Sequence, residues 1–366
     1  MPPAKLNLRD IAELEQRSPS GKFHSFSKNV SLALGAPRNV GVWGGGHPFD
    51  FQIRRIPPGA AVCPHHAHVV QWEFFHVLRG TGTVRAGDAR HAIRAGDNFL
   101  HPPGEAHQLL NTGTDDLEVF IVADNPQLDA FYYPDSDKWG LRTPSVFFKL
   151  TPVDYFEGED PVVAAPDPAA KVRNTDIVPG AADNHVAAKV RNTDFAPPAL
   201  TPPATPFTQR LRHTDDLAWE DWSSPKGKYR GSFRGVSLAF GAQHRTPVGL
   251  GGHPFDIEFG KVPVGATLFP FHWHALQWEF YCFTAGRGEF RLGEERFAVE
   301  PGDCVMAAPH VAHAFTNTGD SDLHYVVIAD DPPNDFWCYP ESGKFGHAKP
   351  RKIFRATDAD WLDGEE

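Results

Sequence analysis

The sequence has little of what marks a secreted, membrane-spanning or nucleic-acid-binding protein. Its 366 residues include four cysteines and no CxxC pair, so we expect free thiols in a reducing compartment. No apolar run approaches the length of a membrane span, and the stretch MPPAKLNLRDIAELEQ has no apolar core typical of a secretion signal. The formal net charge is −11 without any basic run, which argues against nucleic acid and anionic membranes as partners. We therefore expect a cytoplasmic protein whose partner is a small-molecule substrate.

Long amphipathic helices are also missing. The best helix candidate is residues 8–16, LRDIAELEQ, and none stands out between residues 40 and 130. Instead, the stretch 81–100, TGTVRAGDARHAIRAGDNFL, alternates and turns twice at AGD, and 287–306 turns at LGEE and PGD. These are hairpin signals, so the sequence predicts an all-β fold of two barrels or sandwiches with one helix at 8–16.

What the sequence does contain is a large internal repeat. Residues 21–140 align without a gap with residues 227–346, so residue n of the first copy corresponds to residue n + 206 of the second. The segment GGHPFD, for example, occurs at 45–50 and again at 251–256. A register kept over this length indicates duplication of a whole domain rather than of a small repeat unit.

The chain between the two copies differs in composition. It is rich in Ala, Pro and Asp, has Phe195 as its one aromatic residue, and repeats AAKVRNTD at 169–176 and 187–194. Such a segment can bury little apolar surface, which is typical of a linker. We predict an N-terminal domain, a linker and a C-terminal domain over residues 1–156, 157–206 and 207–366.

Histidines and a glutamate recur at the same places in both copies. The stretch PHHAHVVQWEFF (64–75) returns as PFHWHALQWEFY (270–281). His66 and His68 share a face if they lie on a strand, and Glu73 joins them only if a turn near residues 69–70 resets the register. Because ligand-type residues are kept where neighbours differ, we predict metal binding by His66, His68, Glu73, His107, His272, His274, Glu279 and His313. The alternative is a buried hydrogen-bond network without a metal.

These residues carry a family resemblance. The patterns G-(x6)-HxH-(x4)-E-(x6)-G from Gly59 to Gly80 and G-(x5)-PxG-(x2)-H-(x3)-N from Gly96 to Asn111 resemble the two cupin motifs. The first has one residue more than usual before HxH, and in the second copy Ala308 and His310 replace the usual Pro and Gly. The chain thus resembles a bicupin, and most closely cupins without an assigned activity. The resemblance implies two tandem double-stranded β-helix (jelly-roll) barrels that hold a metal and a small ligand.

The donor set indicates a class of chemistry. Three imidazoles and one carboxylate suit a divalent Fe, Mn, Ni, Co or Zn ion, one per cupin domain, with positions left for a bidentate substrate. Bicupins that resemble this chain include dioxygenases, so we favour a dioxygenase-like enzyme acting on a small oxygenated molecule. A non-catalytic ligand-binding bicupin, a decarboxylase and a sugar isomerase remain alternatives. The stretch GATLFPFHWH (265–274) lacks the arginine of the decarboxylase strand, which argues against the decarboxylase.

A few other residues are candidates for the chemistry. Tyr281 aligns with Phe75 and could donate a proton, and Glu105 is a candidate acid or base in the first half. Gln71 and Gln277 should face inward with the glutamates and could hydrogen-bond the site. His47 and His253, in the GGHPFD segments, are interpreted as parts of structural turns. Pairing of barrel edges would make the chain a homodimer, which is a further expectation.

Overall fold

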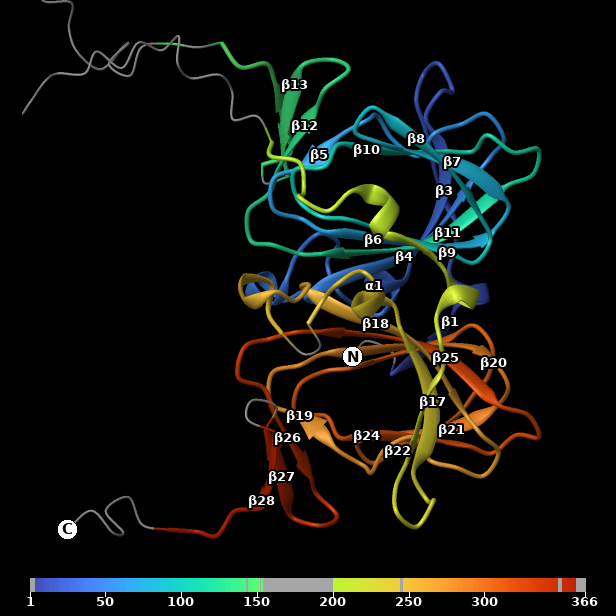
Figure 1. Ribbon diagram of the computed structural model, residues 1–366, viewed down its shortest axis with the longest axis vertical. Coiled ribbons are helices and arrows are strands. Elements are labelled where there is room, and N and C mark those ends of the chain that lie inside the picture. The colour runs from blue at the N-terminus through green and yellow to red at the C-terminus, as the bar shows by residue number, and fades with distance from the viewer. Residues whose placement is uncertain are drawn as a thin grey trace, which may run out of the picture.

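The computed structural model describes residues 4–142, 144–151, 153, 200–243, 246–347 and 351–359, and within them two β-barrels lie one above the other (Figure 1). The all-β expectation is confirmed. The predicted linker falls outside the described residues except for 200–206, as do both AAKVRNTD segments. The domain boundaries stay predictions. No helix of the described residues is long and apolar enough to cross a membrane.

Three antiparallel sheets form the first barrel. The large sheet has the order β15 (Leu211–His213), β9 (Asp97–His101), β6 (Glu73–Arg79), β11 (Leu117–Asp124), β4 (Phe49–Ile56), β3 (His24–Asn29), β2 (Leu14–Arg17). The small sheet facing it has the order β10 (His107–Leu110), β7 (Thr81–Ala86), β8 (Ala89–Arg94). The third sheet projects at one end, in the order β14 (Val146–Phe148), β13 (Lys138–Leu141), β12 (Ala130–Tyr133), β5 (Ala67–His68).

The second barrel repeats this plan. Its large sheet has the order β1 (Lys5–Asn7), β23 (Asp303–Ala307), β20 (Glu279–Ala285), β25 (Leu323–Asp330), β18 (Phe255–Val262), β17 (Arg230–Gly235), β16 (Glu220–Ser223). The small sheet is β22 (Glu295–Val299), β21 (Gly288–Leu292), β24 (His313–Asn317), and the third is β19 (Trp273–His274), β26 (Phe336–Tyr339), β27 (Lys344–His347), β28 (Lys352–Arg355). The helices are short: α1 (Val30–Ala33), α2 (Val236–Ala239) and the 3-10 turns η1 (Leu8–Asp10), η2 (Val42–Gly44), η4 (Phe207–Gln209), η5 (Thr214–Asp216), η6 (Val248–Leu250).

The predicted hairpins are present. Strands β7 and β8 pair with Ala86 opposite Ala89, so Gly87 and Asp88 form the two-residue turn, with Gly87 at φ 56°. A positive φ is what this tight turn requires, and glycine adopts it without strain. The second AGD segment has a different role: it carries the chain from β8 in the small sheet to β9 in the large one. Two facing sheets, and hence a barrel interior, result.

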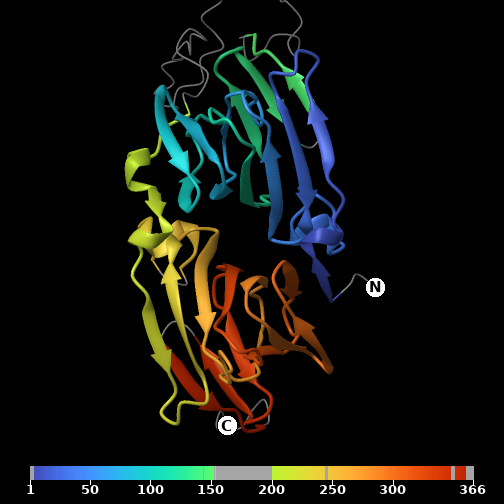
Figure 2. The same cartoon turned by 90° about the vertical axis from the view of Figure 1, so that its right-hand side faces the viewer.

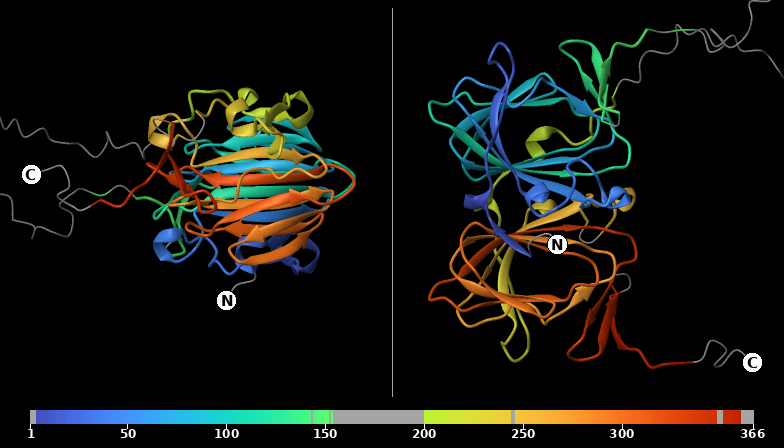
Figure 3. Two further views of the ribbon diagram at one scale, coloured as in Figure 1. Left: turned by 90° about the horizontal axis from the view of Figure 1, so that it is seen from below. Right: turned by 180° about the vertical axis from the view of Figure 1, so that it is seen from behind.

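Each large sheet ends in a strand from the other half of the chain. Strand β15 pairs with β9, so that Leu211 lies opposite Phe99. Strand β1 pairs with β23, so that Leu6 lies opposite Cys304. Figure 2 shows the yellow-green segment running along the upper barrel before it enters the lower one, and Figure 3 (right) shows the blue N-terminal strand against the lower barrel. Each half of the chain thus adds a strand to the large sheet of the other barrel, and these strands cover β9 and β23.

The helix expected at 8–16 was wrong. Residues Leu8–Asp10 form one 3-10 turn, capped by the Asn7 side chain, which accepts from the Arg9 N–H, and Leu14–Arg17 are the edge strand β2. A nine-residue helix is marginal by itself. Pairing with β3, with Leu14 opposite Ser27, instead satisfies the backbone of this segment.

A third core lies between the two barrels, in addition to one inside each. The rings of Phe51 and Phe280, one from each barrel, are 4.6 Å apart. His47 packs on Trp278 at 5.2 Å and, reciprocally, His253 packs on Trp72 at 5.1 Å. Side chains that point out of their own barrel thus bury apolar surface against the other, which joins the two barrels into one folded body.

Candidate metal centres

Two backbone segments bring each histidine set together. In the first barrel His66 and His107 form an antiparallel bridge, with His66 N–H donating to His107 O at 3.1 Å and His107 N–H to His66 O at 2.7 Å. Strand β5 ends at His68 and β6 begins at Glu73, with a bend between them that resets the register as expected. The second barrel has the same bridge between His272 and His313.

The four predicted side chains of the first barrel converge. Nε2 of His66 lies 3.1 Å from Nε2 of His68, and Nε2 of His107 lies 2.7 Å from Oε2 of Glu73. That glutamate oxygen is 4.0 Å from Nε2 of His66 and 3.8 Å from Nε2 of His68. Donor atoms that surround one ion at about 2.1 Å lie about 3 to 4 Å apart. Ligand atoms of His66, Glu73 and His107 all lie within 4.8 Å of one another, and His68 approaches this group through His66 and Glu73.

The second barrel has an equivalent cluster. Nε2 of His313 is 2.5 Å from Oε2 of Glu279, and Nε2 of His274 is 3.9 Å from Oε1 of the same carboxylate. Ligand atoms of His272, Glu279 and His313 all lie within 4.8 Å of one another. Each barrel therefore holds one His/Glu group able to bind a metal, and neither group contains a thiolate.

The imidazoles are fixed through their other nitrogen. Nδ1 of His66, His107 and His272 lies 3.0, 3.0 and 2.9 Å from the carbonyl oxygens of Pro64, Glu105 and Pro270. When Nδ1 carries the proton and donates it to a carbonyl, Nε2 keeps a free lone pair. The backbone thus prepares these side chains for coordination through Nε2.

Sequence reasoning missed the two aspartates that orient the middle histidines. Nδ1 of His68 is 2.6 Å from Oδ2 of Asp129, and Nδ1 of His274 is 2.6 Å from Oδ2 of Asp335. A carboxylate behind a metal-binding imidazole fixes its tautomer and raises its basicity. Asp129 and Asp335 occupy equivalent positions, so the internal repeat itself carried the signal that could have found them.

The charges at both sites favour an ionised glutamate. Burial alone would raise the pKa of Glu73, but the hydrogen bond with His107 and the neighbouring imidazoles hold that pKa well below its usual value. Burial is opposed in the same way at Glu279, where His274 and His313 keep the pKa low. An ionised carboxylate is the state in which this side chain binds a divalent cation.

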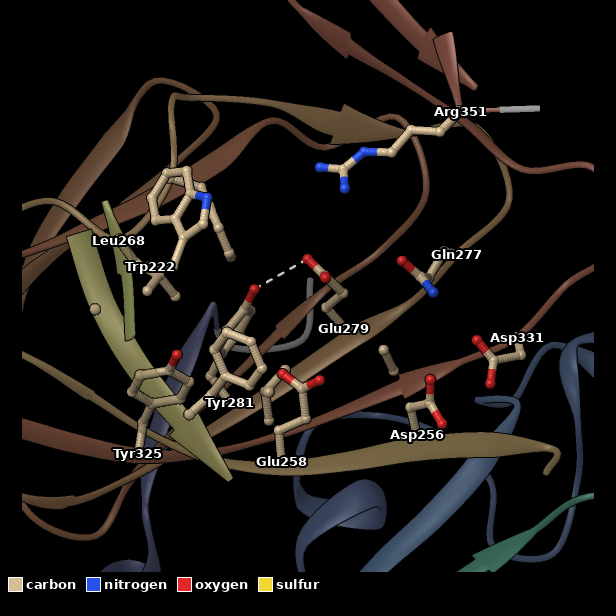
Figure 4. Close-up of a pocket in the computed structure, with 15 residues that line it drawn as sticks. Trp222, Asp256, Glu258, Leu268, Gln277, Glu279, Tyr281, Tyr325, Asp331 and Arg351 are labelled. Atoms are coloured by element: carbon tan, nitrogen blue, oxygen red, sulfur yellow. Dashed lines mark hydrogen bonds between the residues drawn. The ribbon is translucent and has the colours of Figure 1, made fainter. Parts of the chain in front are cut away.

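Two cavities reach the second cluster. One has a volume of about 330 Å³ and is lined by Glu279, Tyr281, Gln277 and Tyr325, and the other, of about 360 Å³, is lined by His272, His274 and Glu279. Arg351 lines both, and Figure 4 shows its guanidinium group above Glu279. A small molecule in these spaces would lie directly beside the ligand residues.

Tyr281 lines the cavity of about 330 Å³ and contacts Glu279, a predicted metal ligand. Its hydroxyl donates to Oε2 of Glu279 at 3.0 Å, which Figure 4 shows as a dashed line, and lies 3.5 Å from Nε2 of His313. Burial, together with the charge of Glu279, raises its pKa well above the usual value. The hydroxyl therefore keeps its proton. Its catalytic role remains a prediction.

The predicted glutamines lie beside the sites. Nε2 of Gln71 donates to the Asp124 carbonyl at 2.5 Å, and Oε1 accepts from Arg142 at 2.6 Å. Nε2 of Gln277 donates to the Asp330 carbonyl at 2.6 Å, and this side chain lines the 330 Å³ cavity. Both amides are held by the fold, and a role in the chemistry stays a prediction for each.

Glu105 is engaged away from the cluster. Its carboxylate accepts from Nη2 of Arg210 at 2.6 Å and lies 2.6 Å from Nδ1 of His101. Burial would raise its pKa, but these two partners lower it to about 2. Glu105 is thus an ionised member of a buried ion pair, and an acid–base role for it remains untested.

The comparisons with known proteins agree with this geometry. The family model described as "Cupin domain" matches residues 52–123 and 259–329, once in each barrel. The chain is a bicupin. Both tandem barrels thus have the double-stranded β-helix fold that the resemblance implied.

Individual relatives match short segments of this bicupin. An oxalate-binding protein of Thermotoga maritima is 35% identical over 72 residues, which are 20% of this chain and 59% of the relative. Auxin-binding protein 1 of Arabidopsis thaliana is 26% identical over 137 residues, 35% of this chain and 64% of the relative. In both cases the match spans less than two thirds of the relative's own length.

Solved structures match over most of the chain. Lactobacillus farciminis oxalate decarboxylase, in complex with formate, superposes with a TM-score of 0.51 at 16% identity, over 92% of this chain and 88% of that one. A putative glyoxylate-induced protein of Pseudomonas aeruginosa gives a TM-score of 0.50 at 12% identity, over 86% of this chain and 84% of that one. At these identities the likeness concerns the fold.

Proposed function

We propose that this bicupin is a metal-dependent enzyme that acts on a small oxygenated molecule in a dioxygenase-like reaction. The observation that carries the proposal is the group of His272, His313 and the ionised Glu279 beside a cavity of about 330 Å³, with Nε2 of His274 3.9 Å from the same carboxylate. Bound divalent iron or manganese would supply Lewis acidity and a binding place for O2. Four protein ligands leave two positions of a six-coordinate ion for the substrate.

The protein's own residues would orient the substrate. Tyr281 keeps its proton and could donate a hydrogen bond to an oxygen of a molecule held near Glu279. The aromatic and aliphatic wall of Phe233, Tyr325 and Val327 would exclude water from the same space. A flat molecule with two adjacent oxygens, such as a catechol or a diketone, suits this combination.

A second candidate is decarboxylation of a small carboxylic acid. The strand that leads to HxH lacks an arginine, but Arg351 lines both cavities at the second cluster. A guanidinium group is the natural partner of a carboxylate. Oxalate appears in the names of one relative and of several structural neighbours, and this supports including it as a substrate to be tested.

Turnover separates these candidates from a non-catalytic binding protein. Protein loaded with Fe(II) or Mn(II) would be given catechols, diketones, hydroxy acids and oxalate while O2 uptake and CO2 release are followed. O2 consumption in step with ring or diketone cleavage supports the dioxygenase. CO2 release without O2 consumption supports the decarboxylase. Metal binding without turnover of any compound in the panel would overturn the enzymatic proposal in favour of a ligand-binding role.

A further inference from the structure

Equivalent interior positions differ sharply between the barrels. In the first barrel Arg54 on β4 lies directly opposite Val119 on β11. At the equivalent place in the second barrel Gly260 lies opposite Tyr325. A Cβ at Gly260 would come 2.0 Å from Cζ of Tyr325, so the tyrosine ring lies over bare backbone there. One barrel has a long cation at this position, and the other has no side chain at all.

Arg54 is buried and held in place. It is 7% exposed, and its Nη1 donates to Oε1 of Gln16 at 3.1 Å and to Oγ of Ser25 at 3.2 Å. Its Nε donates to Oε1 of Gln52 at 3.3 Å. Burial, followed by the charge of Arg38, lowers the pKa of Arg54, and the nearby charge of Glu73 opposes only part of this shift.

The partners of Arg54 correspond to walls of the open cavity. Gln16, Ser25 and Gln52 are equivalent to Trp222, Gly231 and Glu258 of the second barrel, and those three line the cavity of about 330 Å³. The guanidinium group of Arg54 therefore lies in the part of the first barrel that corresponds to this cavity. Phe75 stands where the second barrel has the hydroxyl of Tyr281.

The first site is also braced from outside its barrel. The His101 ring stacks on the His107 ring at a centroid distance of 4.0 Å, with planes 6° apart. The Phe207 ring stacks on His101 at 5.2 Å. Phe207 and Arg210 come from the segment that leads into the second barrel, and Arg210 pairs with Glu105. Ala307, Val311 and Ala4 occupy the positions of His101, Glu105 and Arg210 in the second barrel.

We propose that the two metal sites have different functions: the second barrel admits the substrate, and the first, filled by Arg54, holds a structural metal. This inference rests on the proposed metal-dependent function. In the second barrel no cation extends from Gly260, and Trp222, Glu258 and Glu279 line an open cavity. In the first barrel Arg54 occupies the corresponding space, and the contacts around His107 hold the ligand residues in a fixed arrangement.

The test compares proteins that keep one site each. The double variant His66→Ala/His68→Ala keeps the second site, and His272→Ala/His274→Ala keeps the first. Each is loaded with Co(II), its metal content is measured, and it is titrated with 4-nitrocatechol while the absorption of Co(II) and of the bound catecholate is recorded. We expect the second site to bind the probe about tenfold or more tightly than the first, because the interior of the first is already filled.

Exchange of the interior residue sharpens the test. Arg54→Gly in the protein with the first site alone should permit binding of 4-nitrocatechol, and Gly260→Arg in the protein with the second site alone should abolish it. Arg55→Gly is the matched control, because Arg55 is the next residue on β4 and pairs with Glu13 and Asp116 instead. It should leave probe binding unchanged.

The outcomes discriminate clearly. Equal binding of 4-nitrocatechol by the two single-site proteins, or binding by neither, overturns the proposal even if an interior variant fails to fold. Stronger binding by the first site alone would reverse the assignment. Binding at the second site without turnover of any tested compound would leave the division of the sites intact and refute the enzymatic function.

Discussion

The two barrels keep the same ligand residues but differ in what surrounds them. In both, an aspartate lies 2.6 Å behind the middle histidine, and a glutamate lies within hydrogen-bonding distance of the last one. Around this shared arrangement the first barrel has Arg54, His101 and Glu105, where the second has Gly260, Ala307 and Val311. The two copies thus share a His/Glu group able to bind a metal, while the side chains that surround this group differ.

The largest expected effect is on metal content itself. His66→Ala should remove about half of the bound metal, and His272→Ala the other half, because each deletes one donor of a four-donor site. Mass spectrometry of metal per chain checks this in each variant. A double variant that retains as much metal as the wild type would refute the ligand assignment in both barrels.

The same variants test the difference between the sites. Loss of metal from the first barrel should lower the melting temperature more than loss from the second, and loss from the second should abolish turnover. Thermal unfolding and activity are measured on each single variant. Equal losses of stability and activity in both variants would contradict the proposed difference between the two metal sites.

Breaking the buried ion pair between Arg210 and Glu105 should strongly lower the free energy of unfolding. Arg210 is 3% exposed, and Arg210→Met leaves the Glu105 carboxylate buried without its cation, which typically destabilises a protein by about 3–5 kcal/mol. Arg291→Met is the control in the second barrel. Its partner Glu341 is well exposed, so about 1 kcal/mol or less is expected. Chemical denaturation of both variants checks the contrast, and similar losses would contradict it.

Removal of the orienting carboxylates should weaken both sites alike. Asp129→Asn and Asp335→Asn keep the size of the side chain but take the negative charge from behind His68 and His274. Loss of such a partner typically lowers metal affinity about 10–100-fold. Competition with a chelator of known affinity measures the change at each site. A clear loss of metal affinity in one barrel alone would show that the aspartate supports metal binding in that barrel only.

Sequence alone predicted what the repeat preserves. His66, His68, Glu73 and His107 could be found because their counterparts stand at the same offset in the second copy. Arg54 and Arg210 could not, since each occurs in one copy, and their roles depend on partners that are distant in the sequence. The helix at 8–16 failed for a related reason: its pattern is local, but pairing of β2 with β3 decides its structure.

The smallest effect that we predict concerns a residue found in the first barrel alone. His76 packs on Phe259 of the second barrel at 4.9 Å, and its Nδ1 lies 2.8 Å from Oδ1 of Asn98. Cys282 occupies its position in the second barrel. Burial lowers the pKa of His76 to about 4. The folded protein therefore resists protonation of this ring, whereas the unfolded chain takes up the proton near pH 6.5.

This difference fixes the sign of a pH effect. The contribution of His76 to stability is complete above pH 6.5 and is lost as the pH falls toward 4, because the unfolded state binds the proton first. His76→Asn retains a hydrogen-bond donor for Asn98 but cannot titrate. Between pH 7.5 and pH 5 the wild type should lose about 2 kcal/mol of its free energy of unfolding through His76. The variant should not show this loss. Denaturation at both pH values checks this: if wild type and variant weaken equally, acid acts on groups other than this contact between the barrels.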